Sequence, residues 1–269
     1  MVKRLGYIVL FALLLSSCEV IREEDRFISV PTPLSGERTH VLIEYTGFRC
    51  VNCPTAALHA AQLKQICGEQ LIIVAMHPAS NPFTQGVAQY DYTCPEADFY
   101  YRHMGGTAST AFPTGNINMA MTEDGYLSDY LQWGGLIAKA MQEECYAFIS
   151  AKATIDTITR QVEITTTAHS DIEKEYQLLV WLTEDSIVGA QALPDGNVDT
   201  HYYHHHVLRA TSEEAWGTKW LLSHTPTQQT HVISIPEKCE IKHCHVITLL
   251  LDKKTKEILN AAQTTLTPI

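Results

Sequence analysis

Two cysteines two residues apart, Cys50 and Cys53, lie between a short apolar run and a segment with helical spacing. The run 40–45 is apolar and β-branched and has polar neighbours, which is typical of a buried strand. From 53 to 67 good helix formers recur at helical spacing, and a glycine follows. A second apolar run at 71–76 completes a strand–helix–strand unit, which requires parallel strands joined by a right-handed crossover.

This arrangement favours particular thiol chemistry. The first cysteine lies at the helix N-terminus, where unpaired backbone N–H groups and the helix dipole stabilise a thiolate. We therefore expect Cys50 to be the attacking sulfur and Cys53 the resolving one. Pro54 fits because the first helical turn has no N–H partner to lose.

The rest of the chain indicates two domains. A last helix is expected over 127–151, which completes an α/β domain. Beyond it the pattern changes to alternating apolar and polar residues, in runs such as 176–182 and 245–251. Six or seven short strands separated by turn signals predict an all-β, immunoglobulin-like sandwich. The expected division is an α/β domain at 38–150 and a β-sandwich domain at 151–269.

The N-terminus has the pattern of a cleavable signal peptide. Lys3 and Arg4 precede an apolar run of about nine residues, whereas a membrane-spanning helix needs roughly twenty. The run ends in two serines followed by Cys18. We expect residues 1–17 to be removed and Cys18 to carry acyl chains such as palmitate, with an ordinary signal peptide as the alternative. Acyl chains hold a protein on a membrane without spanning it.

Residues 18–37 are expected to form the lipidated tether, because their acids and prolines cannot build a core. Removing residues 1–17 lowers the number of Lys and Arg from 19 to 17 while 30 Asp and Glu stay, so the formal charge changes from −11 to −13. Such an acidic body is not expected to bind nucleic acid. The expected partners are the lipid membrane, through Cys18, and exported proteins. The expected location is the cell envelope, on the periplasmic or surface side of the outer membrane.

Three features around the cysteine pair resemble the thioredoxin superfamily. The pair follows a strand, Glu44 lies six residues before Cys50, and a Phe-Pro-Thr sequence with Pro113 falls after the second strand. The resemblance implies an α/β thioredoxin-like domain at 38–150. It also implies that Glu44 transfers a proton to Cys53, and that Pro113 follows a cis bond and shapes a substrate groove.

A longer resemblance is to the outer membrane protein 28-related lipoproteins. The matching elements are 44–47, 50–54, 112–115, 206–209 and 216–217. They extend over nearly the whole chain after Cys18, and imply an exported lipoprotein with the same two-domain plan. Surface or adhesive roles have been suggested for that family.

Three interpretations of Cys50 and Cys53 stay open. The pair exchanges disulfides through a mixed disulfide, which would make the protein a thiol-disulfide oxidoreductase. Alternatively, the pair is a static bridge in a non-enzymatic binding or adhesion lipoprotein of an oxidising compartment. Metal binding by the pair has less support, because no second Cys-x-x-Cys exists. A β-sandwich that covered Cys50 would exclude turnover on protein substrates.

The remaining cysteines cannot all pair within one chain, because seven are left once Cys18 is set aside. Cys239 and Cys244 flank a short turn, where a hairpin disulfide and two buried thiols are both open. Cys145 is expected to be a core residue on the apolar side of the last helix. The pairing of the others, Cys67 and Cys94, is not determined.

Thirteen histidines raise the question of a metal site. Strand alternation places His204 with His206 on one face and His243 with His245 on another, so paired strands could present four imidazoles. No acid at a fixed spacing completes a catalytic set, and we expect no metal. Glycine-rich phosphate loops and Gly-x-Ser-x-Gly elbows are absent from the sequence, so no cofactor is expected.

Overall fold

The computed structural model describes residues 38–85, 91–212 and 215–269. The predicted signal peptide, Cys18 and the tether lie outside the described residues. None of the helices in these three ranges is long and apolar enough to cross a membrane.

The predicted strand–helix–strand unit is present near the N-terminal end of the described chain. Strand β1 (His40–Tyr45) pairs in parallel with β2 (Leu71–Met76), and helix α2 (Cys53–Cys67) makes the crossover. Strand β3 (Thr114–Ile117) adds to the other edge of β1 in antiparallel orientation. Every residue of these three strands is buried, because helices cover both faces of the sheet here.

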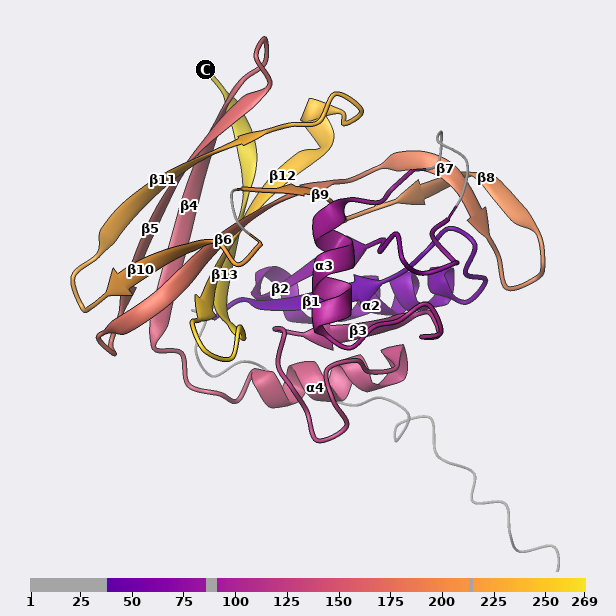
Figure 1. Ribbon diagram of the computed structural model, residues 1–269, viewed down its shortest axis with the longest axis horizontal. Coiled ribbons are helices and arrows are strands. Elements are labelled where there is room, and N and C mark those ends of the chain that lie inside the picture. The colour runs from indigo at the N-terminus through magenta and orange to yellow at the C-terminus, as the bar shows by residue number, and fades with distance from the viewer. Residues whose placement is uncertain (1–37, 86–90, 213–214) are drawn as a thin grey trace, which may run out of the picture.

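Alternation along β1 sends its side chains into two separate cores. Leu42 packs with Ala56 and Leu63 of α2 and with helix α4 (Trp133–Ala140). On the other face, Val41, Ile43 and Tyr45 pack with helix α3 (Pro95–His103), which lies across this part of the sheet in Figure 1. The cysteine pair belongs to the second core.

Most of the remaining chain is β-structure. The strands are β4 (Ala147–Asp156), β5 (Gln161–Ser170), β6 (Lys174–Glu184), β7 (Ile187–Ala192), β8 (Val198–His204), β9 (Val207–Thr211), β10 (Thr218–Leu222), β11 (Thr227–Ser234), β12 (Cys244–Asp252) and β13 (Ile258–Pro268). Eleven strands form one mixed sheet in the order β11-β5-β4-β13-β12-β6-β9-β2-β1-β3, with β10 paired to β6 outside this path. Only β7 and β8 stand apart, as a two-stranded hairpin within the described residues.

The predicted fold class is therefore wrong. An α/β thioredoxin-like domain followed by an all-β immunoglobulin-like sandwich would have three separate sheets, one in the first domain and two in the sandwich. The described strands other than the hairpin instead form one continuous mixed sheet. Strand β9 joins the parts, because it pairs in parallel with β2 and antiparallel with β6. The division into domains at residue 150 stays a prediction, and that position falls inside β4.

The β-rich end is built from two packed layers. Side chains of β4, β5 and β11 meet those of β6 and β12 in a common core that includes Ile155, Ile164, Leu182, Ile233 and Val246. Strand β13 connects the layers, since it pairs antiparallel with β12 and, at its end, in parallel with β4. The antiparallel pairing expected from the alternating pattern is thus largely present.

The predicted helix over 127–151 is also wrong. The structure has a short 3₁₀ turn at Tyr130–Gln132 and then α4, which ends at Ala140. From Ala147 the chain is already in β4, paired with β5 along its whole length. Apolar residues at helical spacing do not show where a helix ends when a strand follows closely. Here the hydrogen bonds between β4 and β5 hold the chain from Ala147 onward in a strand.

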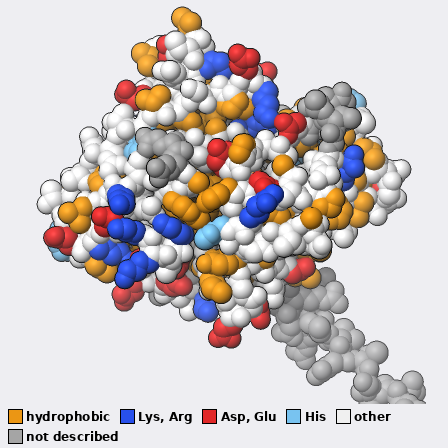
Figure 2. Space-filling view, in the orientation of Figure 1, with side chains coloured by type: hydrophobic (Ala, Val, Ile, Leu, Met, Phe, Trp, Pro, Cys, Tyr) orange, Lys and Arg blue, Asp and Glu red, His pale blue; other side chains and the backbone are white. Residues whose placement is uncertain are grey.

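Charged side chains of both signs lie beside one another on the surface. On the face in Figure 2, basic side chains gather at the lower left, where acidic side chains border them. Hydrophobic side chains are exposed between the charged groups near the middle of this face.

Candidate functional site

The loop after β1 brings the cysteine pair to the start of α2. The Cys50 N–H donates to the Gly47 carbonyl at 2.9 Å, and the Arg49 N–H donates to the Phe83 carbonyl at 3.1 Å. A Cβ on Gly47 would lie 2.5 Å from the Phe83 oxygen, so this close approach requires glycine. Helix α2 begins at Cys53, with Pro54 in its first turn as expected.

Cys50 and Cys53 form a disulfide in the structure. Both are buried, each with 2% of its surface exposed, while Val51 and Asn52 between them are exposed. Solvent therefore reaches the dipeptide between the cysteines, whereas the two sulfur atoms of the bridge are almost completely buried.

Pro113 lies directly before β3, the strand that pairs with β1. The Phe112–Pro113 peptide is cis, as the resemblance to thioredoxins implies. Phe112 packs in the core that contains Cys50 and Cys53. Its ring lies 5.7 Å from that of Tyr101 and 5.9 Å from that of Phe83. The groove-shaping role of Pro113 stays a prediction.

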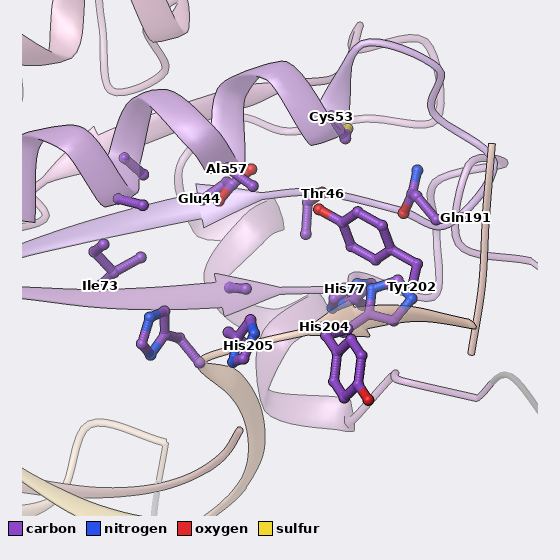
Figure 3. A pocket seen from close by; sticks show the side chains of 15 residues that line it. Glu44, Thr46, Cys53, Ala57, Ile73, His77, Gln191, Tyr202, His204 and His205 are labelled. Carbon is purple, nitrogen blue, oxygen red and sulfur yellow. The ribbon is translucent and has the colours of Figure 1, made fainter. Parts of the chain in front are cut away.

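Glu44 is a buried acid without a hydrogen-bond partner at Oε1 among the described residues. The residue is 3% exposed, and burial raises the pKa of its carboxyl to about 8. Its side chain borders a cavity of about 120 Å³ that Thr46 and Cys53 also line. Figure 3 shows Glu44 beneath α2, on the wall of the cavity from which Cys53 also projects. The structure thus places the predicted acid and the predicted resolving cysteine around one cavity.

The hairpin of β7 and β8 covers this cavity and the cysteine loop. The Gln191 Nε2 donates to the Cys50 carbonyl at 2.9 Å, and the Ala192 N–H donates to the Phe48 carbonyl at 2.8 Å. Tyr202 and His204 of β8 line the cavity opposite α2 (Figure 3). None of these hairpin residues could be assigned to the thiol site from the sequence, which indicated His204 only as a candidate metal ligand.

His77 lies at the floor of the same cavity. It is 2% exposed, and neither ring nitrogen has a hydrogen-bond partner among the described residues. Burial, with His204 and Arg209 adding to it, lowers the pKa of His77 well below its usual value. The imidazole is therefore neutral at physiological pH and contributes no charge to the site.

The four histidines considered for a metal site are not brought together. His204 packs against Tyr92 at a ring distance of 4.3 Å, whereas His206 and His245 flank Asp185. Although burial alone would raise the pKa of Asp185, hydrogen bonds from these two histidines hold it well below its usual range. The described residues contain no group of three or more ligands that could hold a metal ion.

Cys239 and Cys244 are two buried thiols in the structure, not the hairpin disulfide. The Arg209 Nε donates to the Cys239 sulfur at 3.2 Å. Cys67 and Cys94 are also buried thiols, on α2 and just before α3. Cys145, expected inside a helix, instead follows α4, where its thiol donates to the Ala147 carbonyl.

Comparison with known proteins identifies the family. The model of the family described as outer membrane protein Omp28 matches residues 98–268, which is more than half of the chain. The chain belongs to the Omp28 family. This Omp28-family protein is thus an outer-membrane lipoprotein of the cell envelope. No curated protein matches its sequence.

Solved structures resemble the Omp28-family chain in fold. HBP35 of Porphyromonas gingivalis has 17% identity and a TM-score of 0.69, covering 86% of this chain and 76% of its own. Protein AGR_C_4864 from Agrobacterium tumefaciens has 13% identity and a TM-score of 0.50, covering 86% and 96%. A domain of the outer membrane lipoprotein Omp28 from P. gingivalis has 16% identity and a TM-score of 0.34, covering 47% and 92%. At these identities the first two similarities concern the fold alone.

Proposed function

We propose that this lipoprotein exchanges disulfides with exported proteins through Cys50 and Cys53. Glu44 carries the proposal, because it is a buried carboxyl with an unpaired oxygen beside the cavity that Cys53 lines. An unpaired acid in a core destabilises the fold, and strongly shifted acids cluster at functional sites. A bridge that only braces a turn needs no acid behind it.

In the reduced protein, the Cys50 thiolate attacks a partner disulfide and forms a mixed disulfide, releasing one partner thiolate. Cys53 then attacks the Cys50 sulfur, which releases the second partner sulfur and restores the Cys50–Cys53 bridge. The ionised form of Glu44, a minority at neutral pH, accepts the proton that Cys53 loses. Its pKa of about 8 suits it to hold or release a proton near neutral pH. Acylated Cys18 would keep the site at the membrane surface.

Because Cys50 is 2% exposed, exchange with a protein requires the β7–β8 hairpin to move. Two hydrogen bonds, from Gln191 and Ala192, join this hairpin to the cysteine loop. Exposed edge hairpins open at low cost compared with core strands. The closed arrangement is the resting state, and partner binding would displace the hairpin.

The same burial favours a second candidate function. In that case the protein is a non-enzymatic binding or adhesion lipoprotein, and the bridge stabilises the turn before α2. The observation that favours it is the near-complete burial of Cys50 and Cys53.

The deciding experiment measures the reduction potential of Cys50 and Cys53 in the mature lipoprotein in detergent, by equilibration with thiol buffers, alkylation and mass spectrometry. A potential at or above roughly −270 mV supports exchange, and one below about −300 mV supports the structural bridge. Glu44→Gln should slow exchange with a model disulfide about ten- to hundredfold if Glu44 handles the proton.

A variant of the β7–β8 hairpin tests whether the hairpin protects the Cys50–Cys53 bridge. Gln191→Ala should make reduction of the bridge several-fold faster than in the unmodified protein, because it removes the bond to the Cys50 carbonyl. Gln228→Ala is the matched control, since Gln228 makes an exposed hydrogen bond to Thr167 on β5. Equal reduction rates in all three proteins, together with a low potential, would establish the second candidate.

A further inference from the structure

A second pair of sulfurs lies far from Cys50 in the sequence, on the β-rich part of the molecule. Cys239 and Cys244 flank the 3₁₀ turn Ile241–His243, directly before β12. They are 4% and 3% exposed and carry free thiols. Both line a cavity of about 690 Å³, which Ile155 of β4 and Leu266 of β13 border from the neighbouring strands.

The two sulfurs of this pair have different polar neighbours. The Arg209 Nε donates to the Cys239 sulfur at 3.2 Å and lies 3.2 Å from Glu184 Oε2. The Cys244 thiol donates to the Glu240 carbonyl at 3.4 Å. Cys239 therefore accepts a hydrogen bond from a cation, which favours the thiolate form of this sulfur.

The pKa values of the two thiols also differ. The neighbouring Cys244 thiol, and then Arg209, lower the pKa of Cys239 although burial opposes them. The nearby Cys239 sulfur and burial raise the pKa of Cys244. Cys239 is therefore the more acidic of the two thiols.

We propose that Cys239 and Cys244 form a second redox site, in which Cys239 reacts with a hydroperoxide. The Cys239 thiolate attacks one peroxide oxygen, so that an S–O bond forms as the O–O bond breaks. With one proton taken up, the products are the Cys239 sulfenic acid and an alcohol, or water when the oxidant is hydrogen peroxide. The Cys244 thiol then attacks the sulfenic sulfur, which forms the Cys239–Cys244 disulfide and releases water.

Each thiol is oxidised by one electron in the overall reaction, and the peroxide is reduced by two. The burial of both sulfurs excludes a folded protein as the oxidant, whereas a small molecule can enter through the cavity. This site is independent of exchange at Cys50 and Cys53, because it uses other sulfurs in another part of the fold.

The test uses the fully reduced mature lipoprotein in detergent and one equivalent of hydrogen peroxide, followed by alkylation and peptide mass spectrometry. We expect the Cys239–Cys244 disulfide to form at least tenfold faster than Cys67 or Cys94 is oxidised. These two are suitable internal controls, because burial raises the pKa of both thiols. In Cys244→Ser, the Cys239 sulfenic acid should accumulate and be captured by dimedone.

Arg209→Lys keeps the positive charge but removes the Nε–H that donates to the Cys239 sulfur, and should slow oxidation of Cys239 about tenfold or more. The comparison of Cys239 with Cys67 and Cys94 in the unmodified protein tests the proposal even if a cysteine variant fails to fold. The proposal is overturned if Cys239 reacts no faster than Cys67. It is also overturned if Cys244→Ser yields no dimedone adduct on Cys239, or if oxidation links Cys239 or Cys244 to a different cysteine.

Discussion

At the scale of single residues, Glu44 is the group whose environment departs furthest from that of a typical glutamate. A carboxylate is poorly solvated in a core, and burial is the cause of the raised pKa of Glu44. The folded protein therefore holds the Glu44 proton up to a pH of about 8, whereas the unfolded chain releases it near pH 4.5, the ordinary pKa of the side chain. Between these values the folded state binds more protons than the unfolded state, so folding stability falls as the pH rises.

Glu44→Gln removes this linkage. We expect the variant to be about as stable as the unmodified protein at pH 4.5, and more stable at pH 7.5 by about 2 to 4 kcal/mol. Urea unfolding at several pH values, with the Cys50–Cys53 bridge intact, measures the difference in the free energy of unfolding.

Glu163→Gln is the matched control, because it makes the same chemical change at an exposed position on β5. If Glu44→Gln differs from the unmodified protein by the same free energy at every pH, Glu44 is ionised in the folded state. The proton transfer proposed for it would then lose its support.

At the scale of elements, β3 is held closely between β1 and α4. A Cβ on Gly115 would lie 2.6 Å from the Ile43 carbonyl oxygen and 2.7 Å from the Trp133 ring. Neither neighbour can retreat, since one is the backbone of a central strand and the other is fully buried. Gly134 on the facing helix is different, because its nearest neighbour would be a Leu63 methyl group at 3.5 Å.

This contrast gives a matched pair of glycine variants. Gly115→Ala should lower the free energy of unfolding by about 1 to 3 kcal/mol through overpacking. Gly134→Ala should raise it by about 0.5 to 1 kcal/mol, because alanine is the better helix former. Chemical unfolding of both proteins measures these changes. A Gly115→Ala protein as stable as the unmodified one would show that β3 and α4 are not packed as closely as described.

Local sequence patterns identified several of these elements. The strand–helix–strand unit and strands such as β6 and β12 were predictable, because each buries its own apolar run. The pattern did not reveal how β9 connects the two parts, since only Ala75 and Val207 pair between β2 and β9. Sheet order depends on such long-range pairings, which periodicity does not encode.

The residues of the candidate site were also only partly predictable from the sequence. Cys50, Cys53, Glu44 and Pro113 could be singled out because they belong to a short motif and its resemblance. Gln191 could not, since its contact with Cys50 crosses 141 residues of sequence. The aromatic and histidine side chains that end β8, from His201 to His204, were the one signal in the sequence that this hairpin strand packs against another part of the protein.

At the scale of the whole molecule, one core connects parts that the sequence suggested were separate domains. Ile43 and Val74, from β1 and β2, belong to the same buried cluster as Leu179 of β6 and Leu249 of β12. The sheet is continuous between them through β9. A perturbation of β12 should therefore reach β1, and the chain should unfold in a single cooperative transition.

Leu249→Ala tests this cooperation. The side chain is fully buried, so its truncation should lower the free energy of unfolding by about 2 to 5 kcal/mol. Hydrogen exchange followed by mass spectrometry would report protection separately for peptides from β1 and β12. In one cooperative unit both peptides lose the same free energy of protection, because their slowest amides exchange through global unfolding. Val198→Ala, an exposed change on β8, should leave both within about 0.5 kcal/mol. If the β1 peptide keeps its full protection in Leu249→Ala while the β12 peptide loses it, the two parts unfold independently. The predicted division at residue 150 would then separate two units of stability that share one sheet.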